Sequence, residues 1–400
     1  MTNINNIDVN DKENRINIPS DNPKQVKNNI ILKNGFRKFY FKEFPKKIID
    51  IENISKREFG FMSFDNVMQR HQSFSSLGRL QAYLIKEIPS DVYCSNSFYN
   101  FPTFPMQDKQ WLGADLIFDI DLKDLHLPCD KSHSYHICKK CKNISSIEIN
   151  SCIMCNDTRF SKITFPCKIC ISSLKKEVEK LLDFLIVDFG IDKNSIHVFF
   201  SGNTGFHLHV NVQSLRELYS QSRADLSSYI LGKELMPEFF GIRKQKDTFT
   251  VKIPYFGIDY GWRKRTFEKL GIDTVTKQRM SFLTNKLGGY YGFRTKLSEI
   301  GNELGARIDP MVTMDIHRIF RMPYSINSKS GLIKTRCDNL DTFEPFNDSC
   351  LEDDSMIDIM INYPIKFRLK NKSYNFDKTR KNVPFYLACY LVCKGFADFL

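Results

Sequence analysis

The sequence lacks any apolar run long enough to cross a membrane. A membrane-spanning helix needs roughly 18 or more consecutive apolar residues, whereas the best candidate, residues 385–393, stops at Lys394. The N-terminal residues lack the apolar stretch of a signal peptide, and paired Cys-x-x-Cys units are the only internal repeat. These absences exclude a membrane protein and predict a cytoplasmic or nuclear location.

The chain carries more basic than acidic side chains. Lysine and arginine together number 58, and aspartate and glutamate 46, which gives a net charge of +12. This balance favours a polyanionic partner such as nucleic acid. Asn, Ile and Lys are abundant, as in proteins encoded by AT-rich genomes, so coding bias is an alternative explanation for part of the excess.

Composition and periodicity divide the chain into segments. Residues 1–28 are rich in Asn, Asp, Lys and Ser and predict a disordered leader. We expect a folded core over 29–345, within which about 213–305 carries mostly helical patterns and basic patches, typical of a small helical subdomain. Residues 346–400 carry no recognisable motif, so their role stays open.

Residues 113–122 alternate with a period of two and predict a strand with an acidic face. Its apolar face comprises Leu116, Phe118 and Ile120, and its acidic face comprises Asp115, Asp119 and Asp121. Aspartates at i and i+2 lie close enough to share divalent cations, and nucleotidyl transfer uses two such ions roughly 3.5–4 Å apart. Asp119 and Asp121 are therefore candidate ligands, although a single Asp-x-Asp also suits a solvated strand face.

The twelve cysteines, in a chain without a secretion signal, indicate reduced thiols and metal binding rather than disulfides. Two Cys-x-x-Cys pairs with ten residues between them have the spacing of a zinc ribbon; they are Cys138, Cys141, Cys152 and Cys155. A second set of three thiolates and one imidazole is available from Cys129, His133, His136, Cys167 and Cys170. The spacing does not distinguish the two histidines. Both sites are predicted to be structural, because full protein coordination leaves no open position for a substrate.

A helix and a hairpin are expected after the cysteines. Apolar residues recur at helical spacing over 174–186, and two strand-like segments, 196–200 and 207–212, flank the glycine-containing turn 201–206. Glycines in the turn let backbone N–H groups approach a phosphate. His207 could reach the same triphosphate, whereas His209 suits a structural role.

In this order the motifs resemble the small, catalytic subunit of the heterodimeric primase of archaea and eukaryotes, within the archaeo-eukaryotic primase superfamily. The matching segments are Arg-Glu-Phe-Gly-Phe (57–61), Arg-His-Gln-Ser-Phe (70–74), Phe-Asp-Ile-Asp (118–121), Ser-Gly-Asn-Thr-Gly-Phe-His (201–207), Arg-Ile-Asp-Pro (307–310) and Arg-Ile-Phe-Arg-Met-Pro-Tyr-Ser (318–325). Several short motifs in the correct order are more specific than any one of them.

The resemblance implies an α/β fold, a mixed-sheet primase catalytic core bearing a zinc-binding insertion at 129–170 and a small helical subdomain. It implies template-directed synthesis of short primers on single-stranded DNA from nucleoside triphosphates during DNA replication. The implied cofactors are catalytic Mg²⁺ or Mn²⁺ and structural Zn²⁺, and the implied partner is a larger primase subunit with an iron–sulfur cluster.

The resemblance also assigns roles to single residues. The catalytic metal ligands would be Asp119, Asp121 and Asp309. The incoming nucleotide would be bound by Arg57, Ser201, Gly202, His207, Arg318, Arg321 and Asn327. The zinc site of the family matches Cys129, His133, Cys167 and Cys170, which makes the ribbon of Cys138, Cys141, Cys152 and Cys155 an insertion with a second zinc ion.

The sequence departs from the family pattern at the nucleotide site. Many relatives carry an arginine inside the turn where this chain has Asn203 and Thr204, and the family commonly has histidine where this chain has Asn327. An asparagine still donates a hydrogen bond but cannot carry a proton. Both departures put nucleotide affinity in doubt and leave the metal ligands intact.

Two other functions remain open. One is a single-chain primase-polymerase, or a repair polymerase attached to a ligase, from the same superfamily. The other is a non-catalytic zinc-ribbon protein that binds nucleic acid, which would leave Asp119, Asp121 and Asp309 unexplained.

Overall fold

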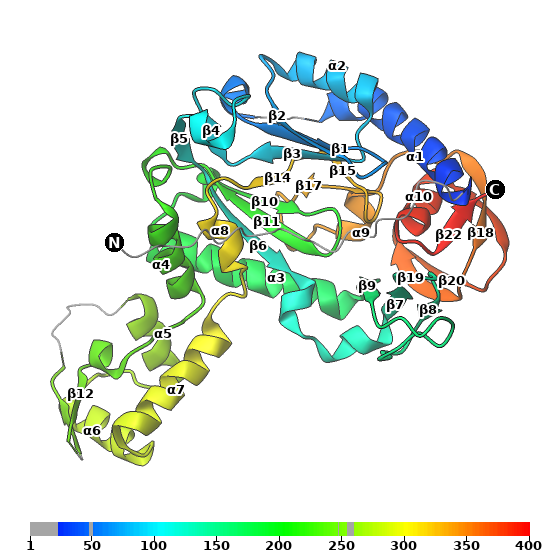
Figure 1. Cartoon of the computed structure of the whole chain (residues 1–400). Coiled ribbons are helices and arrows are strands. Elements are labelled where there is room, and N and C mark those ends of the chain that lie inside the picture. Colours follow the sequence, from blue (N-terminus) through cyan, green and yellow to red (C-terminus); the bar gives the residue numbers. More distant parts are fainter. Residues whose placement is uncertain (1–22, 48–50, 247, 254–259) are drawn as a thin grey trace.

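The computed structural model describes residues 23–47, 51–246, 248–253 and 260–400. Two four-stranded sheets lie at the centre, one above the other in Figure 1. The upper sheet runs β14 (Ile319–Arg321), β3 (Asp91–Ser95), β1 (Phe59–Met62), β2 (Met68–Gln72). The lower sheet runs β17 (Thr335–Arg336), β10 (Ile196–Phe200), β11 (Gly205–Val210), β6 (Leu116–Asp121).

The α/β class is confirmed, but the sheets are not mixed. Every strand pairing among the described residues is antiparallel. The chain passes from β6 through α3 (Lys168–Asp183) to β10, a connection that could have given a parallel pair. The hairpin partner β11 lies between those two strands, so both pair with β11 and neither pairs with the other.

The predicted acidic strand is present but shorter than expected. β6 begins at Leu116, and β5 (Trp111–Ala114) is a separate strand paired with β4 (Ser97–Tyr99). Asp115 lies between β5 and β6, where its carboxylate is 2.6 Å from Arg57 Nη2 and 2.8 Å from Arg216 Nε. Asp115 therefore does not extend the acidic face, because its carboxylate is committed to these two buried ion pairs.

The predicted helix and hairpin are both confirmed. β10 and β11 pair in register from Ile196 opposite Val210 to Phe200 opposite Phe206. The helix α3 continues as a π-helical turn over Phe184–Asp188. Its buried Leu174, Val178 and Leu181 join the main hydrophobic core beside β6 and β11.

A small subdomain hangs below the main body in Figure 1. It contains the helices α5 (Gly261–Lys269), α6 (Lys277–Lys286) and α7 (Gly289–Leu304) and a hairpin of β12 (Ile242–Gln245) and β13 (Thr248–Val251). Its separate core comprises Phe240, Ile242, Val251, Phe267, Met280, Phe293 and Leu297. The predicted subdomain was too long at its start, since α4 (Ser220–Ile230) packs on α8 (Pro310–Met314) in the main body. Sequence reading also missed the hairpin.

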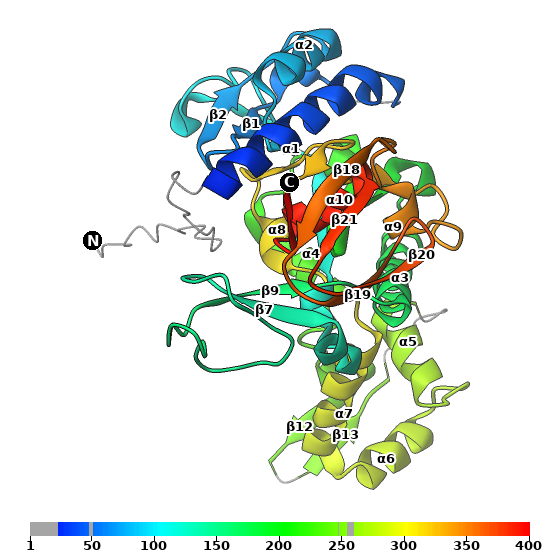
Figure 2. The ribbon, with the colours of Figure 1, turned by 90° about the vertical axis from the view of Figure 1, so that its right-hand side faces the viewer.

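The last part of the chain forms a compact unit, which we call the C-terminal unit, residues 356–400. It contains the sheet β21-β18-β22, the hairpin β19-β20 and the helix α10. Their bounds are β18 (Met356–Ile361), β19 (Ile365–Leu369), β20 (Lys372–Phe376), β21 (Arg380–Pro384), α10 (Phe385–Cys393) and β22 (Ala397–Phe399). Figure 2 shows this unit facing the viewer, with the helix α1 (Pro23–Lys42) crossing above it.

The helix α1 corrects the predicted leader, which was placed at 1–28. Residues 1–22 lie outside the described residues, but α1 begins at Pro23. Its Asn28 is 5% exposed, donates a hydrogen bond to Asp398 Oδ1 at 2.8 Å and accepts one from the Phe399 N–H at 2.9 Å. The polar composition of this segment does not predict a buried helix, because the hydrogen-bond partners of the Asn28 side chain lie 370 or more positions away in the sequence.

Among the described residues, no helix is both long and apolar enough to cross a membrane. The apolar helix α10 has only nine residues and lies buried between β18, β21 and β22.

Replacing Asn28 with alanine should loosen the junction between α1 and β22. The change leaves the buried Phe399 N–H and the Asp398 carboxylate without this partner, which costs about 1–3 kcal/mol. Hydrogen exchange of residues 397–400 should therefore accelerate. Lys33→Ala on the exposed face of α1 is the matched control; equal protection in both variants would contradict the assigned contact.

Candidate active site and metal centres

Three aspartates meet where β6 ends. Asp119 and Asp121 project from β6, and Asp309 is the N-cap of α8, where its side chain accepts a hydrogen bond from the Met311 N–H at 3.0 Å. The backbone N–H of Asp309 donates to the Asp119 carbonyl oxygen at 2.9 Å, which attaches α8 to the strand. The structure thus brings together the three predicted metal ligands, although Asp309 lies about 190 positions after Asp119 and Asp121 in the sequence.

The electrostatics of this cluster suit a cation. Burial, followed by the neighbouring carboxylates of Asp121 and Asp309, raises the pKa of Asp119 to about 7. Lys123 and Arg318 oppose the shift without cancelling it. The donor set therefore fits hard divalent cations such as Mg²⁺ or Mn²⁺.

His207 faces the aspartates from the next strand. It lies opposite Asp119 in the β6–β11 ladder, with Nε2 3.4 Å from Asp119 Oδ1. Burial, followed by the charges of Lys334, Arg321 and Arg318, holds its pKa well below the usual value, so the imidazole is neutral. Its Nδ1 atom is buried and has no hydrogen-bond partner among the described residues.

The turn 201–206 lies beside the same cluster. Ser201 Oγ accepts hydrogen bonds from the N–H groups of Asn203 and Gly205, at 3.4 and 3.2 Å. Thr204 Oγ1 donates to Asp121 Oδ1 at 3.1 Å, which ties the turn to the carboxylates.

Gly202 and Asn327 lock the other side of the turn. Gly202 has a φ of 82°, and a Cβ there would lie 3.1 Å from both Asn327 Cβ and the Leu332 carbonyl oxygen. Asn327 Nδ2 donates to the Ser201 carbonyl oxygen at 3.3 Å. The turn therefore has a fixed backbone, and the predicted Ser201, Gly202 and Asn327 lie together.

The three predicted arginines lie in different settings. Arg318 acts electrostatically on both Asp119 and His207. Arg321 Nη1 is 2.7 Å from Asp91 Oδ1 and donates to the Ile326 carbonyl oxygen at 2.8 Å. The charge of Arg321 also helps to lower the pKa of His207.

Arg57, the third predicted arginine, is held by groups outside the aspartate cluster. It is 6% exposed and stacks 4.0 Å from the centre of the Phe98 ring. Its donors are committed to Asp115 and to the carbonyl oxygens of Glu52, Ser95 and Asn96. Its role in nucleotide binding stays a prediction.

Lys334 is a residue of this site that sequence reading missed. Its ammonium donates to His209 Nε2 and to the Arg321 carbonyl oxygen, both at 2.9 Å, and the residue is fully buried. Burial, followed by the charge of Arg321, lowers its pKa to about 7. No motif surrounds Lys334, so nothing in its neighbourhood marked it. The contact agrees with the structural role expected for His209.

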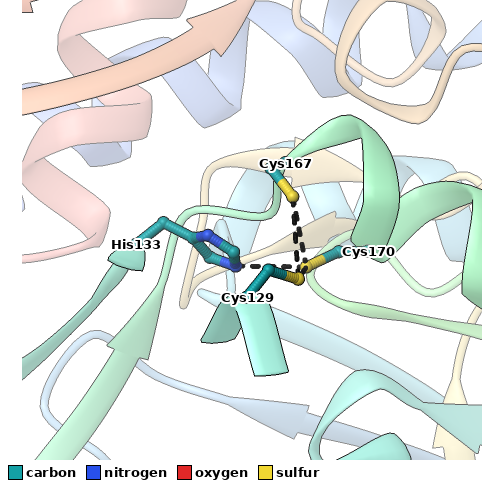
Figure 3. Close-up of side chains that lie close together, drawn as sticks. All are labelled: Cys129, His133, Cys167 and Cys170. Carbon is teal, nitrogen blue, oxygen red and sulfur yellow. Dashed lines mark hydrogen bonds between the residues drawn. The ribbon is translucent and has the colours of Figure 1, made fainter. Parts of the chain in front are cut away.

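The first predicted zinc set comes together at the start of α3, as Figure 3 shows. Cys170 Sγ lies 3.1 Å from His133 Nε2, 3.7 Å from Cys129 Sγ and 3.8 Å from Cys167 Sγ. A tetrahedral zinc ion with bonds of about 2.3 Å separates its sulfur ligands by about 3.8 Å. His133 is therefore the histidine of this set. His136 lies within β7 (Ser134–Cys138), outside the group.

The second predicted set also comes together. Cys138 Sγ is 3.5 Å from Cys155 Sγ, and Cys141 Sγ is 3.5 Å from Cys152 Sγ. These residues lie in an extension of β7, β8 (Ile144–Ser145) and β9 (Phe160–Thr164), which projects to the left in Figure 2. Neither set leaves a ligand position for a substrate, so both fit structural zinc.

Known proteins resemble this chain over nearly all of its length. The family model "DNA primase small subunit" matches residues 154–338. "DNA primase small subunit PriS" of Nitrosopumilus maritimus (strain SCM1) is 41% identical over 368 residues, covering 92% of this chain and 97% of that protein. The protein of the same name from Cenarchaeum symbiosum (strain A) is 37% identical over 374 residues, covering 92% and 98%.

A solved structure, the polymerase domain of Ligase D from Mycobacterium tuberculosis in complex with DNA, is similar to this chain. The alignment covers 80% of this chain and 85% of the solved chain. Its TM-score is 0.35 and its identity 10%. A likeness at this level does not establish a shared fold.

The relatives define an enzyme of the nucleotidyltransferase class. The chain belongs to the DNA primase small subunit family, the catalytic subunit of DNA primase. The alternatives of a single-chain primase-polymerase, a ligase-attached polymerase and a non-catalytic ribbon protein find no support in these relatives.

Replacing His133 with alanine should remove one zinc ion per chain, because the first set then keeps only three ligands. His136→Ala is the matched control and should keep the full zinc content. Elemental analysis of the purified proteins by mass spectrometry gives both values. Loss of zinc from the His136 variant, with retention in the His133 variant, would reverse the assignment.

Proposed function

We propose that Asp119, Asp121 and Asp309 form the catalytic centre for template-directed primer synthesis on single-stranded DNA. The observation that carries this proposal is the meeting of three acidic side chains with the turn 201–206 and His207 at the end of β6. A structural cluster would pair buried carboxylates with basic groups, as Asp115 is paired, whereas here Asp121 and Asp309 raise the pKa of Asp119.

Divalent ions held by the three carboxylates would supply Lewis-acid stabilisation of the attacking and leaving oxygens. In the reaction, the 3′-hydroxyl oxygen of the growing primer bonds to the α-phosphorus of the incoming triphosphate. The bond from that phosphorus to the pyrophosphate oxygen breaks, and the hydroxyl loses its proton. No covalent enzyme intermediate is required.

The chain's own residues would hold the triphosphate. The rigid turn offers the Ser201 hydroxyl and the backbone N–H of Gly202. The space where a Cβ of residue 202 would project is filled by Asn327, Leu332 and Lys334, which fixes the backbone of the turn. A neutral His207 has a buried, unpartnered Nδ1 that a bound group could satisfy. Arg318 and Arg321 add positive charge from β14 and the residue before it.

The wider interactions follow from charge and from the relatives. A net charge of +12 suits a template bound through its phosphates, with little sequence preference and a strong dependence on salt. The relatives are named small subunits, so we propose that a larger subunit completes the enzyme. Their archaeal sources favour the cytoplasm as the location. Two zinc ions would stabilise the 129–170 insertion without taking part in the reaction.

The double variant Asp119→Asn/Asp121→Asn should lose primer synthesis on single-stranded DNA by about 100-fold or more, as when a group that stabilises the transition state is removed. Amides keep the size of the carboxylates but lose their charge. The assay uses Mg²⁺ or Mn²⁺, with and without the larger subunit. Asp124→Asn, on an exposed carboxylate beside the cluster, is the matched control. Full activity in the double variant would rule out the proposed centre.

A further inference from the structure

Lys394 joins three distant parts of the chain beside the nucleotide turn. It is the C-cap of α10 and only 4% exposed. Its ammonium donates to the carbonyl oxygen of Thr164, at the end of β9, and to Asn203 Oδ1, both at 3.1 Å. Figures 1 and 2 both show β9 next to the C-terminal unit, so the zinc-binding insertion, the turn and that unit meet at this side chain.

The surroundings of Lys394 are unusual for a buried cation. Neither hydrogen-bond acceptor is a carboxylate. The ammonium nitrogen Nζ lies 5.4 Å from the centre of the Phe165 ring and 5.5 Å from the centre of the Tyr390 ring. Burying an ammonium without an ion pair is costly. A lysine kept there against that cost points to a use for the charge.

The positive charge of Lys394 lies beside the turn 201–206, which has no charge of its own. Residues 201–206 contain no charged side chain, although a nucleotide triphosphate is strongly anionic. Lys394 holds Asn203, and the next residue, Thr204, donates to Asp121. The negative charge of Asp121 in turn favours the protonated form of Lys394, because it acts to raise the pKa of the ammonium. The cation and the carboxylate cluster thus hold two adjacent residues of the turn.

We propose that Lys394 is a positioning residue that fixes the turn 201–206 and adds positive charge beside it, and thereby sets the affinity for the incoming nucleotide. The inference rests on the proposed function, in which this turn binds the triphosphate. It also gives the C-terminal unit a role, because that unit supplies the lysine.

The test compares Lys394→Met, which keeps the length but loses charge and donors, with Lys394→Arg, which keeps both. In steady-state primer synthesis by the full chain with its larger subunit, Lys394→Met should raise KM for the nucleotide about tenfold, the effect of losing a hydrogen bond to a charged group. The kcat should change much less. Lys394→Arg should restore most of the affinity.

Two further variants separate positioning from general stability. Asn203→Ala removes the acceptor on the turn but leaves the bond from Lys394 to Thr164, and should raise KM in the same direction. The double variant should be no worse than Lys394→Met alone, because both changes break one contact. Lys370→Met removes another lysine of the C-terminal unit, which lies over the Tyr386 ring and pairs with Asp354, and should leave KM unchanged.

An unchanged KM in Asn203→Ala, or an additive double variant, would overturn the inference even if Lys394→Met proved unstable. Equal loss of affinity in Lys370→Met would assign the effect to the unit's stability instead. Failure of the proposed function is a separate result, since it would appear as activity in the Asp119→Asn/Asp121→Asn variant.

Discussion

The antiparallel ladder between β6 and β11 is the constraint on which the rest of the site depends. It sets Asp119 opposite His207 and Asp121 opposite Gly205. A side chain at position 205 would meet the Ile120 carbonyl oxygen at 2.5 Å, so only glycine permits this close pairing. A slip of one residue would turn both aspartates into the core formed by the other face of β6. Register therefore determines whether the proposed catalytic centre can form at all.

The ladder gathers like charges, and the neighbouring structure makes that arrangement rigid. α8 is attached through the backbone of Asp309, the turn 201–206 through Thr204, and β14 through the pair of Arg321 with Asp91. The attachments of α8 and β14 use groups outside the carboxylate cluster, whereas Thr204 donates to the Asp121 carboxylate itself. Two of the three contacts that hold the aspartates together therefore leave the carboxylate oxygens free to bind a cation.

Local patterns predicted much of this site, because local chemistry produces them. Period-two alternation revealed β6, and Cys-x-x-Cys spacing revealed the ribbon, since each pair grips an ion from one turn. Contacts between residues far apart in the sequence could not be predicted from these local patterns. The sequence could not choose between His133 and His136, because the choice depends on which of them meets Cys170 in the fold; His133 precedes β7 and does so, whereas His136 lies within β7. The sequence also contains no sign of α1 or of the role of Lys334, whose polar groups find partners only in the folded chain. Asp115 was misassigned for the same reason, as its two arginines lie 58 and 101 positions away.

The contact of Asn28 with Asp398 and Phe399 also bears on how the protein is made. On the ribosome, Asn28 emerges about 370 residues before these partners. At synthesis rates of about 5–20 residues per second, its side chain waits roughly 20–70 seconds for them. Lys394 lies in the same stretch, so the hydrogen bond that it donates to Asn203 can form only after that stretch has been synthesised.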